Sequence, residues 1–181
     1  MPLILLSGPE DEPLGLAEAK AFLRVEHSDD DTLIAALCKA ARLQVECATG
    51  RRYGDQLWRL VLDAWPECGL VRLPLAPVSA VEAARLRDLA GAETIIDTTA
   101  WVLDPAGSRL VVSSAPMPLR AFAGIEIDLA AGGAAPESVL QATRLIVAHW
   151  YENRSTGDAG QGLGVPPAAL PLIAAERRLR V

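Results

Sequence analysis

The chain has 181 residues, which is the length of one domain or of one domain with a sizeable insertion. A chain of this length buries enough apolar surface to fold without a metal or a disulfide, and a composition of 51% hydrophobic and 22% charged residues is that of an ordinary globular protein. The net charge of −6 and the scattered arginines argue against tight binding of duplex DNA, which needs clustered cations.

The N-terminal residues 1–8 form a short apolar run that lacks a basic leader, and acidic residues follow directly after Pro9. A signal peptide needs a longer apolar stretch with a small-residue cleavage site. A membrane span needs roughly 20 apolar residues, and no run in the sequence approaches that length. We therefore expect a protein that stays in the compartment where it is made and has no membrane partner.

Two amphipathic helices are expected in the first fifty residues. Residues 16–25 carry apolar side chains at helical spacing with charged residues between them. Ser28 offers an N-cap for a second helix, and the acidic residues 29–31 fall in its first turn, where the helix dipole favours negative charge. This helix is expected near residues 29–49, with Gly50 as its C-terminal stop.

From Gln56 onward the apolar period changes from helical to alternating, which is typical of half-buried strands. The clearest alternation spans residues 58–62 and 125–129. Further strands are expected at residues 71–75, 78–87, 93–97, 100–103 and 109–112. The Asp-Pro-Ala-Gly turn at residues 104–107 predicts a hairpin. Short strands joined by short turns predict an antiparallel sheet.

The last part of the chain is predicted to be helical. Pro136 lies where helices often begin, and apolar residues recur at helical spacing from there to residue 153. A glycine-rich loop, residues 155–164, and a short helix delimited by prolines follow.

The expected fold class is α+β, with a helical core that carries an antiparallel β-rich insertion. The long helices of the core are those near 29–49 and 136–153. We predict a single domain, 1–181, in which the helical core comprises residues 14–55 and 134–181 and the β-rich insertion comprises residues 56–133.

The sequence contains no pattern typical of catalysis or of cofactor binding. The glycine-rich loop lacks the Lys-Ser/Thr pair of a phosphate-binding loop and follows a helix rather than a strand. His27 and His149 lie far apart and outside any metal or nucleophile motif. We therefore expect no catalytic residue, no cofactor and no enzymatic activity. An acid pair formed across the sheet stays open, because only folding would reveal it.

No metal site is expected either. Cys38 and Cys47 lie nine positions apart on one helix, so they point to opposite faces, and Cys68 lies alone. The three consecutive aspartates at residues 29–31 splay in different directions, so helix capping and solvation explain them better than metal binding. Three isolated thiols fit a reducing compartment.

The basic residues are almost all arginines, since lysine occurs only at positions 20 and 39. Arginine suits planar, partly desolvated contacts with carboxylates, so this usage is compatible with protein interfaces. An arginine bias inherited from GC-rich coding is an equally good explanation, and the sequence leaves both open.

Several unusual strings occur in a particular order along residues 14–154. The first half carries Leu14-x-Leu16-Ala17-Glu18-Ala19-Lys20-x-x-Leu23-Arg24-Val25, Asp30-Asp31-x-Leu33-Ile34-x-x-Leu37 and Thr49-Gly50-Arg51. The second half carries Gln56-x-Trp58-x-Leu60-x-Leu62-Asp63-x-x-Pro66, Leu73-Pro74-x-x-Pro77-Val78 and His149-Trp150-Tyr151-Glu152-Asn153-Arg154. In this order the strings resemble the phage head-tail connector (adaptor) family, which also occurs in prophages and phage-like gene transfer agents.

The resemblance implies a structural virion protein with a helical core and a β-rich insertion. Members of the family form a ring, typically twelvefold, below the portal of a DNA-filled head, although isolated subunits are often monomers. The ring extends the DNA channel, receives a tail-side stopper or tail completion protein, and lets DNA pass without specific binding. The resemblance also implies a location in the neck of a virion or phage-like particle that assembles in the bacterial cytoplasm.

Candidate interface residues follow from the same resemblance. In this family the C-terminal segment commonly docks on the portal, and here it offers Leu172, Ile173, Arg177, Arg178, Leu179 and Arg180. The alternative for this end is a solvated, frayed tail. Trp58, Trp150, Tyr151 and Arg154 are candidates for the core or a subunit interface. The strands between residues 58 and 129 and the outer faces of the helices are expected to share the subunit contacts.

The rival interpretation is a small α+β ligand-binding domain or enzyme with a pocket between helices and sheet. A cavity lined by convergent polar groups would favour it.

Overall fold

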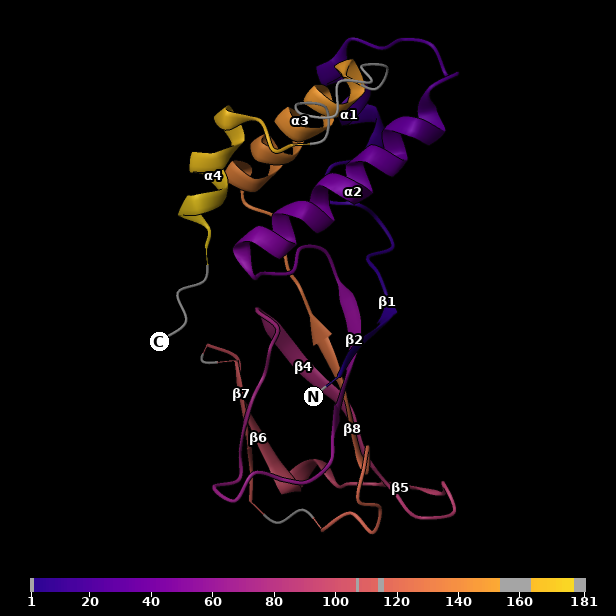
Figure 1. Cartoon of the computed structure of the whole chain (residues 1–181), viewed down its shortest axis with the longest axis vertical. Coiled ribbons are helices and arrows are strands. Elements are labelled where there is room, and N and C mark those ends of the chain that lie inside the picture. Colours follow the sequence, from indigo (N-terminus) through magenta and orange to yellow (C-terminus); the bar gives the residue numbers. More distant parts are fainter. Residues whose placement is uncertain (1, 107, 114–115, 154–163, 178–181) are drawn as a thin grey trace. The chain divides into compact units, whose positions relative to one another are not determined.

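The computed structural model describes residues 2–106, 108–113, 116–153 and 164–177. The chain divides into two compact units (Figure 1). Unit 1 comprises Met1–Pro9 and Asp55–Gly133, and it contains the strands. Unit 2 comprises Glu10–Gly54 and Ala134–Val181, and it contains the α-helices.

Unit 1 is built on a five-stranded antiparallel sheet in the order β1-β2-β8-β4-β5. Its strands are β1 (Leu3–Ser7), β2 (Gln56–Leu62), β8 (Ile125–Ala131), β4 (Val78–Arg87) and β5 (Glu93–Ile95). The central strand β8 alternates Ile125, Ile127 and Leu129 with Glu126 and Asp128, so the apolar set lies on one face and the carboxylates on the other.

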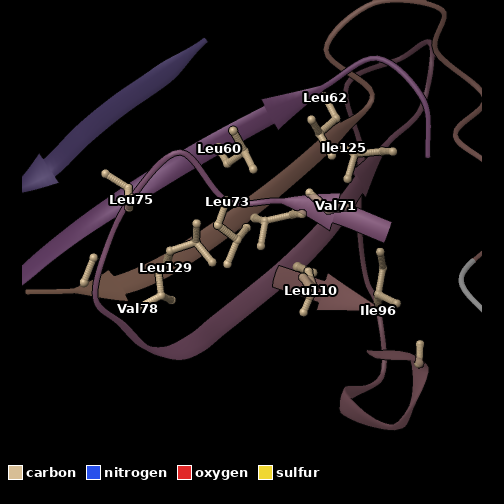
Figure 2. Packing of buried hydrophobic residues seen from close by; sticks show 14 of the residues in the cluster. Leu60, Leu62, Val71, Leu73, Leu75, Val78, Ile96, Leu110, Ile125 and Leu129 are labelled. Carbon is tan, nitrogen blue, oxygen red and sulfur yellow. The ribbon is translucent and has the colours of Figure 1, made fainter. Parts of the chain in front are cut away.

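A second antiparallel sheet, β3-β7-β6, completes unit 1. It consists of β3 (Leu70–Arg72), β7 (Arg109–Val112) and β6 (Trp101–Asp104), preceded by a 3-10 turn, η1 (Thr98–Ala100). Both sheets contribute to one apolar cluster, in which Val71 and Leu110 join Leu60, Ile125 and Leu129 (Figure 2). Strands β6 and β7 form the hairpin that the sequence predicts, with Asp104 paired to Arg109.

In the described part of unit 2, four helices pack around a second apolar core. They are α1 (Leu16–Leu23), α2 (Asp31–Thr49), α3 (Glu137–Glu152) and α4 (Leu170–Ala175), and a 3-10 turn, η2 (Pro167–Ala169), leads directly into α4. The core is formed mainly where α2 packs against α3, through buried side chains at helical spacing. They include Ile34, Cys38, Ala41 and Val45 of α2 and Val139, Ala142, Ile146 and Val147 of α3.

The α+β fold class predicted from the sequence is confirmed, and helices α2 and α3 lie where the two long helices were expected. Gly50 ends α2 as predicted, with a left-handed φ of 71° that glycine adopts without strain. None of the helices among the described residues has the length and apolar character needed to cross a bilayer. The single-domain organisation stays a prediction.

One local expectation was wrong, and one strand was not predicted. Ser28 is not the N-cap of α2: Asp30 occupies that position, and its side chain makes no capping hydrogen bond. Instead Asp30 accepts a hydrogen bond from the Tyr151 hydroxyl, and Asp31 pairs with Lys20, so tertiary contacts use these carboxylates. The apolar run near the N-terminus is an edge strand, β1, which lacks the alternation typical of strands and is recognisable only by its pairing with β2.

Candidate assembly surfaces

The C-terminal segment is held against its own unit. Pro166 and Pro167 lead into the turn η2, where the Ala169 N–H donates to the Pro166 carbonyl over 2.9 Å. At the far end of α4, the carbonyl of Glu176 accepts a 3.0 Å hydrogen bond from Arg51 Nε, and its carboxylate accepts one of 2.8 Å from the Ser138 hydroxyl. The C-terminal end of α4 is therefore fixed to segments far away in the chain.

The predicted portal contacts differ in their surroundings. Ile173 is 6% exposed and belongs to the core of unit 2, while Leu172 is half-buried against that core. Leu170 is 53% exposed, and Arg177 is exposed directly after α4. Arg178, Leu179 and Arg180 lie outside the described residues. Among the described positions, the exposed side chains of this segment therefore include Leu170 and Arg177 but not Ile173.

The aromatic residues at the end of α3 contact their own unit. Trp150 Nε1 donates to the Gly164 carbonyl over 3.1 Å, and the Tyr151 hydroxyl donates to Asp30 Oδ2 over 2.5 Å. Both rings pack partly buried against the core of unit 2. The hydrogen bond of Tyr151 therefore links the end of α3 to the beginning of α2. Arg154, the fourth candidate in this group, lies outside the described residues.

Trp58 lies on β2, two positions before the buried Leu60, and therefore on the core side of the five-stranded sheet. Its ring is half-buried against the core of unit 1, and its Nε1 donates to Gln56 Oε1 over 3.0 Å. These contacts anchor Trp58 within unit 1.

The opposite face of the same sheet carries a row of paired charges, which we call the charge ladder. Its members come from β2, β8, β4 and β5 and are Arg59, Glu126, Asp128, Arg85, Arg87 and Glu93. Asp128 is central: Arg59 Nε lies 2.7 Å from its Oδ1, and Arg85 Nη1 lies 2.5 Å from its Oδ2. Glu126 likewise pairs with two arginines: its Oε2 lies 3.1 Å from Arg59 Nη1, and its Oε1 lies 2.5 Å from Arg87 Nε.

Asp128 is 5% exposed, so its charge depends on these partners. Burial by itself would raise the pKa of the Asp128 carboxyl, but the hydrogen bonds and positive charges of Arg59 and Arg85 outweigh it and hold that pKa below its usual value. The ladder contains three arginines and three carboxylates, so its charges balance. The sequence shows the alternation of Glu126 and Asp128, but only the strand register reveals their partners.

A second buried ion cluster stabilises unit 2 and was also missed by the sequence analysis. Arg42, 5% exposed, donates from Nε to Glu12 over 2.6 Å and from Nη1 to Glu46 over 2.9 Å. Glu46, 3% exposed, also accepts a 3.0 Å hydrogen bond from the backbone N–H of Tyr53. The cluster thus fastens two segments, before α1 and after α2, onto α2. Only the i, i+4 spacing of Arg42 and Glu46 is visible in the sequence.

The cysteines and acidic residues form no metal centre in the part of the chain that the structure describes, where no three His, Cys, Asp or Glu side chains gather to hold an ion. Cys38 is buried, whereas Cys47 and Cys68 are exposed. Burial, with the nearby charge of Glu12, raises the pKa of the Cys38 thiol to about 11. Cys38 is therefore a packing residue of the core.

Helix α2 also presents apolar side chains to solvent. On the side opposite its core face lie Leu33, Ala36, Ala40, Leu43 and Cys47, all exposed, which we call the outer stripe of α2. Leu33 is 38% exposed and Leu43 is 46% exposed. Such a contiguous apolar strip on a surface helix is typical of a contact with another helix or subunit.

Of the comparisons made with known proteins, the one with solved structures gives matches. No protein-family model and no curated protein matches the chain. A chain in the neck of an empty gene transfer agent (GTA) particle, computed with C6 symmetry, is 32% identical with a TM-score of 0.80, and the match covers 100% of this chain and 97% of that chain.

Two further structures match over the same shares of both chains. A chain in the virion of a native GTA particle is 31% identical with a TM-score of 0.80. A chain in the neck of a native GTA particle, computed with C12 symmetry, is 32% identical with a TM-score of 0.78. The similarity therefore extends over both units.

Proposed function

This chain belongs to the head-tail connector (adaptor) family of phages and phage-like gene transfer agents, and from that premise we propose that it is a structural protein of the neck of a phage-like particle. One observation carries the proposal: chains that form part of GTA necks match it from end to end at 32% identity. The role is architectural, without enzymatic activity.

In the particle, copies of the chain form a ring below the portal. A ring of this kind extends the DNA channel and joins the head to a tail-side stopper or tail completion protein. The related necks computed with C6 and C12 symmetry support a dodecameric ring. In a closed ring each subunit contacts its neighbours through two different patches of its surface. Units 1 and 2 act together as a single connector domain, assembled into particles in the bacterial cytoplasm.

The portal contact is made by the C-terminal segment, through Leu172, Ile173, Arg177, Arg178, Leu179 and Arg180. Ile173 contributes by fixing α4 to the core of unit 2, because its side chain is 6% exposed. Arg177 is exposed and suited to a carboxylate on the portal.

DNA passes through the ring without being bound. A net charge of −6 repels the phosphate backbone as a whole. The charge ladder supports this property, because its arginines are engaged by Glu93, Glu126 and Asp128 instead of being available for phosphates. Specific recognition of base sequence is not part of the proposed role.

The test is cryo-electron microscopy of particles purified from a strain that produces them, compared with particles from a strain in which this gene is deleted. We expect ring density between portal and tail that fits units 1 and 2, and tailless heads without that density in the deletion strain. Intact, tailed particles from the deletion strain, or neck density that fits a different chain, would refute the proposal.

A further inference from the structure

The outer stripe of α2 is a continuous apolar surface on the helix. Its residues follow one another at intervals of three, four, three and four positions, from Leu33 to Cys47. At about 100° per residue these intervals keep all five side chains within one narrow sector of the helix. No charged side chain occupies the stripe, although 22% of the whole chain is charged.

A helix at the surface of a single subunit needs only one apolar face. In α2 that face is already formed by Ile34, Cys38, Ala41 and Val45, which are 0–2% exposed in the core of unit 2. The outer stripe lies roughly opposite, so α2 is apolar on two sides. Helix α3 differs, because its two exposed positions are both charged, Glu137 and Glu152. A second apolar face indicates a second partner.

We propose that the outer stripe of α2 is a contact surface for a neighbouring copy of this chain. The proposal rests on the proposed function, because the related necks have cyclic symmetry and every subunit of a ring therefore has two neighbours. Ala36 and Ala40, between the two leucines, let a helix or loop of the neighbour approach closely. Leu33 and Leu43 are the apolar anchors at either end.

The composition of the stripe decides against DNA, and ring symmetry decides against its pairing with the same stripe of a neighbour. DNA would need cations, and the stripe contains none. Contact of the stripe with the same stripe of a neighbour would give a twofold dimer, which does not close into a ring of six or twelve. The stripe therefore meets a different face of the neighbouring copy.

Cys47 provides a probe of this surface in the wild-type protein. It lies at one end of the stripe and is exposed in the single chain, whereas Cys68, also exposed, lies in unit 1. The labelling rates of both thiols with a maleimide reagent are measured by mass spectrometry, for the monomer and for the ring assembled on its portal. We expect the rate at Cys47 to fall by about tenfold or more in the ring, because an interface excludes solvent.

Two results would overturn the inference. Equal labelling of Cys47 in monomer and ring would show that the stripe stays exposed after assembly. Slow labelling of Cys47 already in the monomer, with fast labelling of Cys68, would show that the stripe is covered within the single chain.

A matched pair of variants tests the same surface by substitution. Ala40→Lys places a charge in the outer stripe, and Ala35→Lys places the same charge on another exposed side of the same helix. We expect Ala40→Lys to lower ring formation on the portal by about tenfold or more, and Ala35→Lys to assemble like wild type. Both should keep the circular dichroism spectrum and melting temperature of the wild-type monomer. Equal assembly of the two variants would refute the role of the stripe.

The two proposals fail in different ways. If wild-type protein forms no ring and is absent from particle necks, the proposed function fails and the subunit contact fails with it. If wild-type protein assembles and Ala40→Lys assembles equally well, only the subunit contact fails. Loss of portal binding without loss of subunit contacts, detected by cross-linking, would assign the stripe to the portal instead and would also overturn this inference.

Discussion

At the scale of single residues, the buried charges are explained by their partners. Arg42 is held between Glu12 and Glu46. Burial by itself would lower the pKa of the Arg42 guanidinium, but the hydrogen bonds and negative charges of both carboxylates outweigh it. The pKa of Arg42 is therefore raised. Removing one member of such a cluster leaves the others buried and uncompensated, which costs more than the intact cluster contributes.

We therefore predict that Arg42→Ala lowers the free energy of unfolding by about 3 kcal/mol, within the range for breaking a buried ion pair. Arg144→Ala is the control in the same unit, because its partners Glu18 and Glu137 have side chains that are 45% and 74% exposed and regain water when unpaired. The control should lose about 1 kcal/mol or less. Urea denaturation followed by circular dichroism measures both losses. Equal losses would contradict the stabilising role of the buried ion cluster around Arg42.

The charge ladder makes a prediction about pH. The pKa of Asp128 is lower in the folded protein than in the unfolded chain, so its contribution to stability is present above the unfolded pKa and is lost as pH falls towards the folded value. Between about pH 5 and pH 3, wild type should lose more unfolding free energy than Asp128→Asn, which cannot titrate there. Asp104→Asn, whose partner Arg109 has a half-exposed side chain, is the control and should follow wild type. A variant Asp128→Asn with the wild-type pH slope would contradict this account.

At the scale of elements, position within the sheet decides how much a strand contributes. Strand β8 lies in the middle and pairs with β2 and β4, whereas β1 and β5 are edges. The alternating apolar residues of β8 were visible in the sequence, and so was the exact span of β4. The central place of β8 was not, because strand order depends on pairings between segments far apart in the chain.

An isoleucine pair tests this difference. Ile127 in β8 is 0% exposed and Ile95 in β5 is 75% exposed. We predict that Ile127→Ala lowers the free energy of unfolding by roughly 2–5 kcal/mol, because it leaves a cavity in the core, and that Ile95→Ala changes it by about 0.5 kcal/mol or less. Thermal and urea unfolding curves of the two variants provide the comparison. Similar losses at both positions would show that β8 is not the core of the sheet.

At the scale of the whole molecule, the two units contribute different kinds of surface to an assembly. Unit 1 presents the balanced charge ladder, and unit 2 presents the outer stripe of α2 and the C-terminal segment. In the proposed ring these surfaces have separate roles. A substitution in one surface should therefore not affect the contacts made by the others.

We predict that truncation after Glu176 leaves the fold intact and weakens binding to the portal. Arg177 is exposed, so its loss should not change the melting temperature. The dissociation constant for the portal should rise by about tenfold or more, since interface arginines often contribute over 1 kcal/mol. Replacing the three arginines of the segment by lysine is the control that keeps the charge, and it should bind better than the truncated chain. Unchanged affinity after truncation would place the portal contact elsewhere.

The sequence by itself determined the α+β class, helices α2 and α3, most strands and the family, because periodicity and the order of characteristic strings can be read along the chain. Tertiary structure decided what depends on segments far apart. It made β1 an edge strand, paired Arg42 with Glu12 and Asp128 with Arg59 and Arg85, and used Asp30 and Asp31 for contacts between helices rather than for a cap. It also left one of the two apolar faces of α2 exposed, since a helical pattern shows which side chains share a face but not which face the rest of the chain covers.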